Sequence, residues 1–348
     1  MFDFFIIMHI LENYPLKQIN TFGIDVKTKY LTYLTDNTQI PQLLSHKIFN
    51  ENPQLYLGGG SNVLFVNDFQ GIVVKIATKG IELISKSNNN VLIKAMAGED
   101  WEEFVDFCVS KGFGGLENLT MIPGNVGTSP MQNIGAYGVE LKDCFHSLEA
   151  CETQTGKIRI FSKEECDFGY RESFFKKEGK GQYIILSVTF CLSLNNHVLK
   201  MEYGSIADQL KSMGIIEPQI QDIKNAVKSI RESKIPDPAT LGNAGSFFKN
   251  PVIPKDMFQH ILTQYPEIPH FENNPYFIKI PAAWLIEKAG WKGYRRGDTG
   301  VHQNQALVLV NHGNAKGHEI LALSEQILQS VKQKFGITLE REINVVGN

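Results

Sequence analysis

The segment from Gly112 to Gly138 limits the folds open to this chain more than any other feature. It is rich in Gly, Pro and Asn and carries almost no charge. A loop of this length without secondary structure is uncommon inside a compact domain, and the examples that occur are more often ligand-binding loops than linkers. The segment therefore predicts a binding loop held by regular elements on either side.

Those regular elements can be read from hydrophobic periodicity. Trp101, Phe104, Val105, Cys108 and Val109 recur at helical spacing, and Gly112 is placed to end the helix. Short β-branched and aromatic runs predict strands. The expected strands are 55–57, 63–66, 72–76, 91–97 and 183–194.

The second half of the chain has a different pattern of apolar and turn-forming residues. A helical stripe runs over 223–230 and must end before Pro236, and a last helix over 320–331 is closed by Gly336. Between them, 242–251 is expected to be a Gly/Asn turn. This change of sequence pattern predicts a domain boundary near 205–220.

Composition excludes several classes of protein. The 348 residues are 43% hydrophobic and 20% charged, which is enough apolar mass for packed cores and excludes a disordered chain. The formal net charge of −3 does not call for nucleic acid or an anionic membrane as a partner. No basic residue precedes Lys17, so a secretory signal is not expected, and no apolar run is long enough to span a bilayer.

The cysteines indicate a reducing compartment. Their odd count and lack of CxxC pairs argue against a disulfide framework, and no zinc-like spacing with histidine occurs. We therefore expect a cytoplasmic protein without a structural metal. The five residues are Cys108, Cys144, Cys151, Cys166 and Cys191.

Two glycine-rich segments can bind phosphate or another anion. In 58–62, three glycines precede Ser61 and Asn62 between two expected strands, so successive N–H groups can cradle oxygens. The structural alternative is a flexible hairpin turn, and a Rossmann fingerprint is absent because no helix follows. In 122–138, amides and hydroxyls can wrap a large ligand, or the segment can be a self-packed Ω-loop. Two such loops in one chain favour a dinucleotide.

Three further motifs contain candidate reactive side chains, and each side chain also has a simpler, non-catalytic interpretation. Arg171 in an aromatic turn is usually a surface residue stacked on its neighbour. Ser246, between Gly and Phe-Phe, is normally a turn hydroxyl, and no GxSxG motif supports a serine hydrolase. Glu342 in a final strand would normally belong to an exposed ion-pairing face.

Taken together and in order, these segments resemble the UDP-N-acetylenolpyruvoylglucosamine reductase family, in its longer type. The resemblance runs from about Asn20 to Glu342, nearly the whole chain. Five motifs in the same order make chance implausible. They are GGGSN at 58–62, IPGNVGTSPMQNIGAYG at 122–138, GYRES at 169–173, KIPDP with GNAGSFFKNP within 234–251, and LEREI at 339–343.

The resemblance implies an α+β fold with a two-part FAD-binding domain of the vanillyl-alcohol-oxidase (PCMH) type and a separate α+β substrate-binding domain. The expected FAD-binding subdomains are 1–75 with 336–348, and 76–215. The FAD-binding region as a whole would cover about 23–194. The UDP-sugar domain would cover 216–335.

The resemblance also implies noncovalent FAD and NADPH as the hydride donor. The implied cofactor-binding residues are Gly58, Gly59, Gly60, Ser61, Asn62, Pro123, Gly124, Gly127, Thr128, Ser129, Gln132, Asn133, Gly135, Tyr137, Gly138 and Arg231. The implied substrate-binding residues are Tyr203, Lys234, Asn250, Lys292 and Gln305.

The implied reaction reduces the enolpyruvyl ether of UDP-N-acetylglucosamine enolpyruvate to UDP-N-acetylmuramate, a step of peptidoglycan synthesis and hence of cell-wall growth, cell shape and division. Arg171 and Glu342 would act at the substrate carboxylate, and Ser246 would protonate the α-carbon. The expected enzyme is a cytoplasmic monomer acting on small molecules, without a nucleic-acid, membrane or metal partner.

Two features depart from the family pattern. Asn344 stands where relatives often have Arg, and the apolar stretch Met1–Leu11 lies outside the resemblance. Two other functions stay open at this point. A flavin-dependent oxidase of the same FAD-binding class would make peroxide without the sugar, and a non-catalytic nucleotide-sugar-binding protein would accept no hydride.

Overall fold

The computed structural model describes residues 8–203 and 205–347 and divides them into two compact units. The first unit comprises the residues up to Tyr14 together with Thr28–Gly59 and Gln70–Ser233. The second comprises Pro15–Lys27, Gly60–Phe69 and the chain from Lys234 on. Residues 1–7 of the apolar N-terminal stretch lie outside the described residues.

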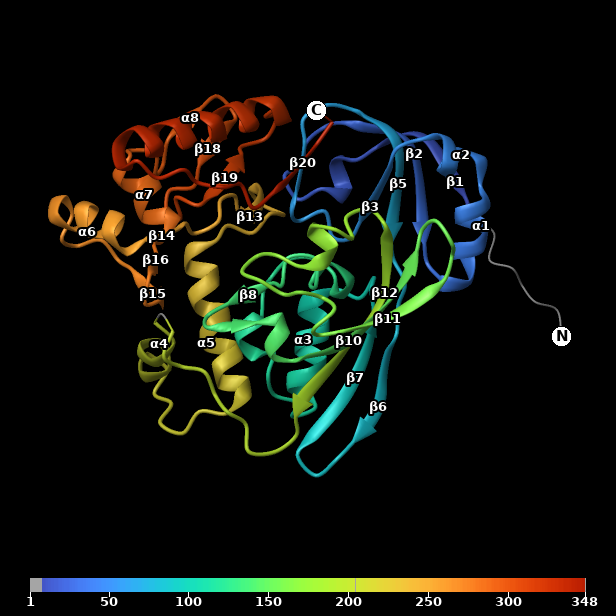
Figure 1. Ribbon diagram of the computed structural model, residues 1–348, viewed down its shortest axis with the longest axis horizontal. Helices are drawn as coiled ribbons and strands as arrows, with labels where there is room; N and C mark the ends of the chain where they lie inside the picture. Colours follow the sequence, from blue (N-terminus) through green and yellow to red (C-terminus); the bar gives the residue numbers. More distant parts are fainter. Residues whose placement is uncertain (1–7, 204, 348) are drawn as a thin grey trace. The chain divides into compact units, whose positions relative to one another are not determined.

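The largest sheet of the first unit has five antiparallel strands (Figure 1). Its order is β11 (Ile158–Ser162), β10 (Phe145–Glu152), β12 (Tyr183–Ser193), β7 (Asn90–Met96) and β6 (Ile81–Lys86). In β7, buried residues alternate with partly exposed ones, as expected when one face of a strand packs on a core.

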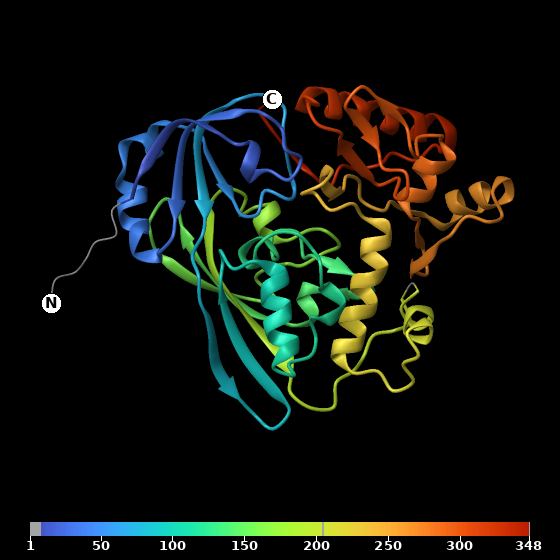
Figure 2. The same ribbon diagram turned by 180° about the vertical axis from the view of Figure 1, so that it is seen from behind.

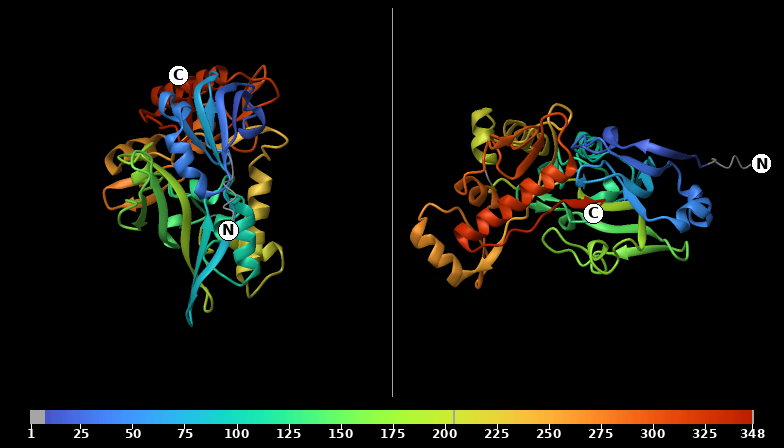
Figure 3. Two further views of the ribbon diagram at one scale, coloured as in Figure 1. Left: turned by 90° about the vertical axis from the view of Figure 1, so that its right-hand side faces the viewer. Right: turned by 90° about the horizontal axis from the view of Figure 1, so that it is seen from above.

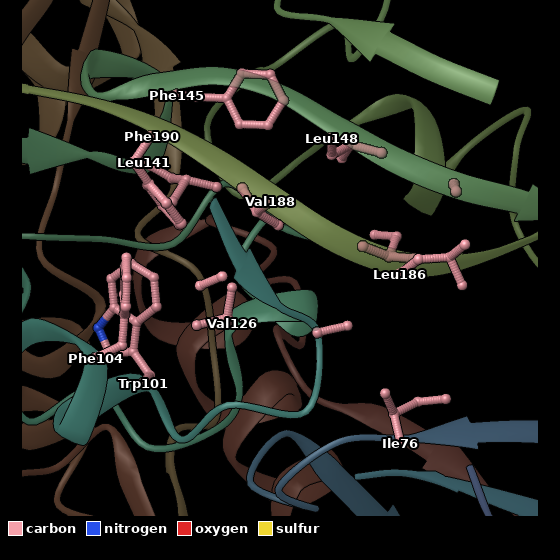
Figure 4. Packing of buried hydrophobic residues seen from close by; sticks show 14 of the residues in the cluster. Ile76, Trp101, Phe104, Val126, Leu141, Phe145, Leu148, Leu186, Val188 and Phe190 are labelled. Atoms are coloured by element: carbon pink, nitrogen blue, oxygen red, sulfur yellow. The ribbon is translucent and has the colours of Figure 1, made fainter. Parts of the chain in front are cut away.

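Helix α3 (Trp101–Ser110) packs its apolar stripe against this sheet (Figure 4). The rings of Phe104 and Phe190 lie 4.8 Å apart, and Trp101 lies about equally far from both, at 6.1 and 6.0 Å. Val126, from the long loop, is fully buried in the same core. The binding loop is therefore anchored in the core by one of its own side chains.

A second sheet of the first unit has the order β1 (Ile10–Pro15), β2 (Lys27–Leu34), β5 (Phe69–Ile76) and β3 (Gln54–Leu57), with β3 and β5 parallel. The short helices between β2 and β3 are α1 (Ile40–Ser45) and α2 (Lys47–Glu51). The short strands β8 (Gly135–Ala136) and β9 (Val139–Glu140) form a hairpin at the end of the long loop.

Helices α4 (Ile206–Ser212) and α5 (Ile220–Lys234) complete the first unit. The buried stripe of α5 packs with Ile206 and Leu210 of α4 and with Tyr137 of the long loop. Helix α5 also lies beside α3, because Lys224 forms an ion pair with Asp106 (Figure 2).

The second unit contains two further sheets. One has the order β13 (Gly242–Ser246), β19 (Val308–Asn311), β18 (Thr299–Val301) and β17 (Arg295–Arg296), and α8 (Gly317–Phe335) lies along it (Figure 3). The other has the order β14 (Val252–Pro254), β16 (Phe277–Lys279) and β15 (Phe271–Asn274). Helices α6 (Lys255–Gln264) and α7 (Ala282–Lys288) belong to the same unit, and β20 (Asn344–Val346) pairs in parallel with β4 (Val63–Phe65).

Most of the expected elements are confirmed. The strands predicted at 55–57, 63–66, 72–76, 91–97 and 183–194 are β3, β4, β5, β7 and β12. The three predicted helices are α3, α5 and α8, and Gly336 ends α8 in the left-handed conformation, with φ +71°.

Two expectations about local structure are wrong. The first half of the expected 242–251 turn is strand β13, paired with β19. Its glycine misled the prediction: a Cβ on Gly242 would lie 2.4 Å from the carbonyl oxygen of Phe22, so glycine is needed there for close backbone approach. The final strand begins at Asn344, after Glu342, and Glu342 is only 9% exposed, so it does not lie on an exposed ion-pairing face.

Candidate active site

Gly58 and Gly59 pack directly against the second glycine-rich loop. A Cβ on Gly58 would lie 2.4 Å from Thr128 Cγ2, and one on Gly59 would lie 2.9 Å from Gly124 Cα. Real Cβ atoms do not approach so closely, so both positions require glycine for packing. The flexible-hairpin alternative is wrong, because β3 and β4 on either side belong to different sheets.

In the second loop, the hydroxyl groups of Thr128 and Ser129 donate hydrogen bonds to backbone carbonyls of the loop itself. Ser129 Oγ donates to the Val126 carbonyl at 2.6 Å, and Thr128 Oγ1 donates to the Asn125 carbonyl at 2.8 Å. The Gly127 amide donates to Ala97 O at 2.9 Å, and a Cβ on Gly127 would lie 2.4 Å from Ala97 Cβ. These residues give the loop its shape from within.

Several polar groups at the junction of the two loops keep unused hydrogen-bonding capacity. Asn125 Oδ1 is buried and accepts no hydrogen bond from the described part of the chain. The backbone amides of Gly59 and Gly124 also donate to none of the described residues. Lys75 donates its ammonium to the Gly58 carbonyl, and burial, followed by the charge of Lys79, lowers its pKa. Donors and an acceptor are thus available here to a ligand with both kinds of polar group.

The remaining part of the loop predicted to bind the cofactor holds the segment 169–173, which carries Arg171. Asn133 Nδ2 donates to the Gly169 carbonyl at 3.0 Å, and Ser173 Oγ donates to the Met131 carbonyl at 2.7 Å. Pro123 and Gly138 are exposed, whereas Gln132 and Gly135 are partly buried.

Arg171 lies in a tight turn that packs on the long loop. Its φ is +56°, in the left-handed region, and the flanking Gly169 and Glu172 pair their backbones. Its guanidinium donates to the Gly135 carbonyl at 2.7 Å and lies 5.5 Å from the ring centre of Tyr170. The side chain does stack on its neighbour, but it is also fixed by a backbone acceptor from the binding loop.

Arg231 and two tyrosines lie close to the same loop. The rings of Tyr137 and Tyr203 meet edge to face at 6.4 Å, and the Arg231 guanidinium donates to the Met121 carbonyl at 3.0 Å. Arg231 Nε is buried and donates to no described residue. Burial lowers the pKa of Arg231, while the charges of Tyr137 and then Glu102 act in the opposite direction.

In the second unit, the C-terminal segment joins two parts of the chain that are far apart in sequence. The Glu342 amide donates to the Phe247 carbonyl at 2.9 Å, and the Lys249 amide donates to the Glu340 carbonyl at 2.8 Å. Lys249 Nζ and Glu340 Oε1 lie 2.5 Å apart in an ion pair. Glu342 is thereby placed beside the residue that follows Ser246.

The same C-terminal segment holds the end of the first glycine-rich loop. Asn62 Nδ2 donates to the Glu342 carbonyl at 3.4 Å. Asn344 donates to the Asn62 carbonyl twice, from its amide at 3.2 Å and from Nδ2 at 3.0 Å. Asn344, which departs from the family pattern, therefore stabilises the GGGSN motif through two hydrogen bonds.

Ser246 ends strand β13 with its side chain exposed. Its backbone is fixed on both sides: the Gly245 amide donates to Asn243 Oδ1 at 2.9 Å, and the Phe247 amide donates to the Leu307 carbonyl at 2.8 Å. Within the described residues, the Ser246 hydroxyl makes no hydrogen bond, so the turn-cap alternative is wrong and Asn243 supplies the cap. The hydroxyl is rigidly placed and accessible.

The four other predicted substrate residues all lie in the second unit, in different settings. Lys234 is exposed at the end of α5, and Asn250 Oδ1 accepts from the Ala282 amide at 2.9 Å, at the start of α7. Lys292 is exposed and forms an ion pair with Glu287 at 3.0 Å. Gln305 lies in the turn before β19, where its carbonyl accepts from the Val308 amide at 3.0 Å.

Sequence reasoning missed residues that hold the site without belonging to a motif. Asn118 is buried, and its Nδ2 donates to the carbonyls of Tyr137 and Lys200 at 2.9 Å each. Lys75 reaches Gly58 from within an ordinary apolar strand pattern. Neither has a local signal, because their partners are distant in sequence.

The described residues contain no cluster of three or more His, Cys, Asp or Glu side chains that could hold a metal ion. No helix among them is long and apolar enough to cross a membrane. All five cysteines are free thiols.

Comparison with known protein families identifies both halves of the chain. The model of an FAD binding domain matches residues 32–162, and the model of the UDP-N-acetylenolpyruvoylglucosamine reductase C-terminal domain matches residues 237–346. With the α+β fold above, these matches define the class as an FAD-dependent oxidoreductase.

The relatives define the family. The UDP-N-acetylenolpyruvoylglucosamine reductase of Flavobacterium johnsoniae is 47% identical over 97% of this chain and 100% of its own length. That of Chromobacterium violaceum is 46% identical over 94% and 96%. This chain belongs to the UDP-N-acetylenolpyruvoylglucosamine reductase family. The reductase structure from Thermus caldophilus has the same fold, with a TM-score of 0.67, 22% identity and coverage of 99% of this chain and 100% of that one.

We predict that Gly60 is the least replaceable glycine of the GGGSN motif. Its φ is +68°, and a Cβ would lie 2.1 Å from the Ile19 carbonyl oxygen. Gly297 is the matched control, with φ +61° and nothing within 4 Å of an added Cβ. Each Gly→Ala change carries about 1–2 kcal/mol of left-handed strain. Gly60→Ala should lose a further ~1–3 kcal/mol from overpacking in urea unfolding, and equal losses in the two variants would contradict the steric argument.

Proposed function

We propose that this chain reduces the enolpyruvyl ether of UDP-N-acetylglucosamine enolpyruvate to UDP-N-acetylmuramate, with noncovalent FAD and with NADPH as the hydride donor. The observation that carries the proposal is the relationship to named reductases over nearly the full length of both chains. The enzyme is a flavoprotein oxidoreductase of peptidoglycan synthesis.

The described residues fit FAD, a ligand with a diphosphate, amide-like donors and carbonyl acceptors. The buried Asn125 Oδ1, the amides of Gly59 and Gly124, and the buried Arg231 Nε all keep hydrogen-bonding capacity that no described residue uses. Buried polar groups are rarely left unsatisfied, so such groups favour a polar ligand. We assign FAD to the glycine-rich loops, within the region of about 23–194, and to Arg231 on α5, which lies outside that region. The UDP-sugar is assigned to 216–335.

FAD bound here would supply the hydride, taken from NADPH, that adds to the terminal carbon of the enolpyruvyl group. Negative charge then develops at the α-carbon and on the carboxylate conjugated with it. We assign Arg171 to this carboxylate as a fixed positive donor, since its guanidinium is already oriented by the Gly135 carbonyl. We assign Glu342 to the same carboxylate, where a shared or added proton lets it donate a hydrogen bond.

Ser246 is assigned the protonation of the α-carbon. Its hydroxyl is exposed at the end of a fixed strand and bonds to no described residue, so its proton is available to substrate. The α-carbanion or enolate is a strong base, which makes proton transfer from a positioned hydroxyl feasible. Water or a neighbouring lysine would return a proton to the serine oxygen.

The remaining assignments follow from the family resemblance. Tyr203, Lys234, Asn250, Lys292 and Gln305 are proposed to hold the UDP-sugar. We further propose a monomeric enzyme of the cytoplasm, and the five free thiols suit that reducing compartment.

Loss of either carboxylate-binding residue should slow turnover while the flavin stays bound. Arg171→Ala and Glu342→Ala each remove one preorganised group from a site where charge develops, so we expect a fall of ~10²–10³ in rate at saturating substrate. Arg159→Ala, which removes an exposed arginine paired with Glu165, is the control and should leave the rate unchanged. A wild-type rate in either site variant would remove that residue from the proposed role.

Ser246 gives the test of the proposed function, because its two half-reactions can be separated. Ser246→Ala should accept hydride from NADPH at nearly the wild-type rate in stopped flow, since that step needs no serine proton. Reoxidation by the enolpyruvyl sugar should fall by ~10²–10⁴, the range of general acid catalysis, and Ser246→Cys should keep part of it through its thiol proton.

The control for this test is Ser233→Ala, which removes an exposed helix serine and should change neither half-reaction. Undamaged reoxidation in Ser246→Ala would exclude Ser246 from the mechanism. Peroxide formation from NADPH without any need for the sugar would instead identify an oxidase, and failure to accept hydride would identify a binding protein.

A further inference from the structure

The first two residues of α3 hold the turn at residues 119–121. Trp101 Nε1 donates to the Leu119 carbonyl at 2.8 Å. The Glu102 carboxylate accepts from Thr120 Oγ1, which lies 2.9 and 3.1 Å from its two oxygens, and it also accepts from the Met121 amide. One carboxylate therefore fixes two successive residues of the turn.

This turn needs such support because of its backbone. Met121 has φ +57°, in the left-handed region that side chains with a Cβ disfavour. The bond from its amide to Glu102 is charge-assisted and hence stronger than an ordinary amide bond. Glu102 is thus the described group best placed to hold Met121 in this conformation.

The strained residue in turn orients Arg231. With its amide bound to Glu102, Met121 presents its carbonyl to Arg231 Nη2 at 3.0 Å. A second tie between the same two helices, the Lys224–Asp106 ion pair, keeps α5 beside α3. The contacts form one continuous path from Glu102 through Met121 to Arg231.

The charge of Glu102 also favours the charged form of Arg231. Burial lowers the pKa of Arg231, and the nearby charge of Arg171 lowers it further, whereas Tyr137 and Glu102 raise it. Glu102 is therefore a counter-charge in a region that contains two arginines. Its carboxylate favours a charged, fixed Arg231 over one that turns toward solvent.

We propose that Glu102 is a positioning residue for the flavin, because it fixes the Thr120–Met121 turn whose carbonyl orients Arg231. The inference rests on the proposed contact between Arg231 and FAD. It adds a residue outside the glycine-rich motifs and outside the catalytic set.

A double-mutant cycle on FAD affinity tests the inference. FAD release on dilution of the holoenzyme is followed by the fluorescence of the free cofactor. Glu102→Ala should weaken FAD binding by roughly 10–100-fold, the usual effect of losing a hydrogen bond to a charged group. In the Arg231→Ala background, Glu102→Ala should add less than about threefold, because its effect passes through Arg231.

Three variants complete the design. Glu102→Gln keeps the shape but loses the charge and should lie between wild type and Glu102→Ala. Thr120→Val removes the hydroxyl donor and keeps the charge, and its effect should also vanish in the Arg231→Ala background, so it decides the matter if Glu102→Ala does not fold. Glu103→Gln, an exposed neighbour on the same helix turn, should bind FAD like the wild type.

The outcomes separate the inference from the proposed function. Unchanged FAD binding in Glu102→Ala, or effects of Glu102 and Arg231 that simply multiply, would overturn the positioning role while leaving the Arg231 contact intact. Wild-type FAD binding in Arg231→Ala would overturn that contact and the inference together, whereas the reductase activity would still be judged by the Ser246 half-reactions.

Discussion

Backbone hydrogen bonds from the C-terminal segment create the arrangement on which the proposed chemistry of the second unit depends. The Glu342 amide binds the Phe247 carbonyl, and Asn344 binds Asn62. These two contacts bring the last residues of the chain beside Ser246 and beside the first glycine-rich loop. They also involve backbone groups, so the placement of Glu342 does not depend on its own flexible side chain. A serine hydroxyl at the end of β13 and a carboxyl group in the segment before β20 are thereby held through backbone hydrogen bonds, as the proposed proton transfer requires.

The first unit solves a different problem, which is to hold a long polar loop without regular structure. Val126 anchors the loop in the aromatic core beneath α3, and glycines at 58, 59 and 127 let its backbone pack against neighbouring chain without room for a side chain. Because internal contacts use most of the loop's hydroxyls, the groups that remain for a ligand are backbone amides, Asn125 Oδ1 and Arg231 Nε. Packing thus decides which polar groups of the motif can bind.

The sequence predicted much of the fold, and the misses share a physical cause. Periodicity located α3, α5, α8 and the main strands, because apolar faces repeat locally. It missed strand β13, where small residues allow close backbone contact and hide the strand pattern. Glu102 and Asn344 were also missed as supporting residues, since their roles depend on partners that only folding brings near. The family motifs named Arg171, Ser246 and Glu342, whereas the contacts that hold them were visible only in three dimensions.

Amide hydrogen exchange in the C-terminal segment tests most directly the claim that backbone hydrogen bonds hold Glu342, the residue proposed to act with Ser246 in the second unit. The amides of Lys249, Glu342 and Asn344 each donate to a carbonyl of a distant segment. The account predicts that these three amides exchange slowly, with protection near that of the strand amides of β19. The exposed turn residues Asn88 and Asn89, whose amides donate to no described residue, give the fast reference. Exchange of the Glu342 amide at the rate of that turn would contradict the account.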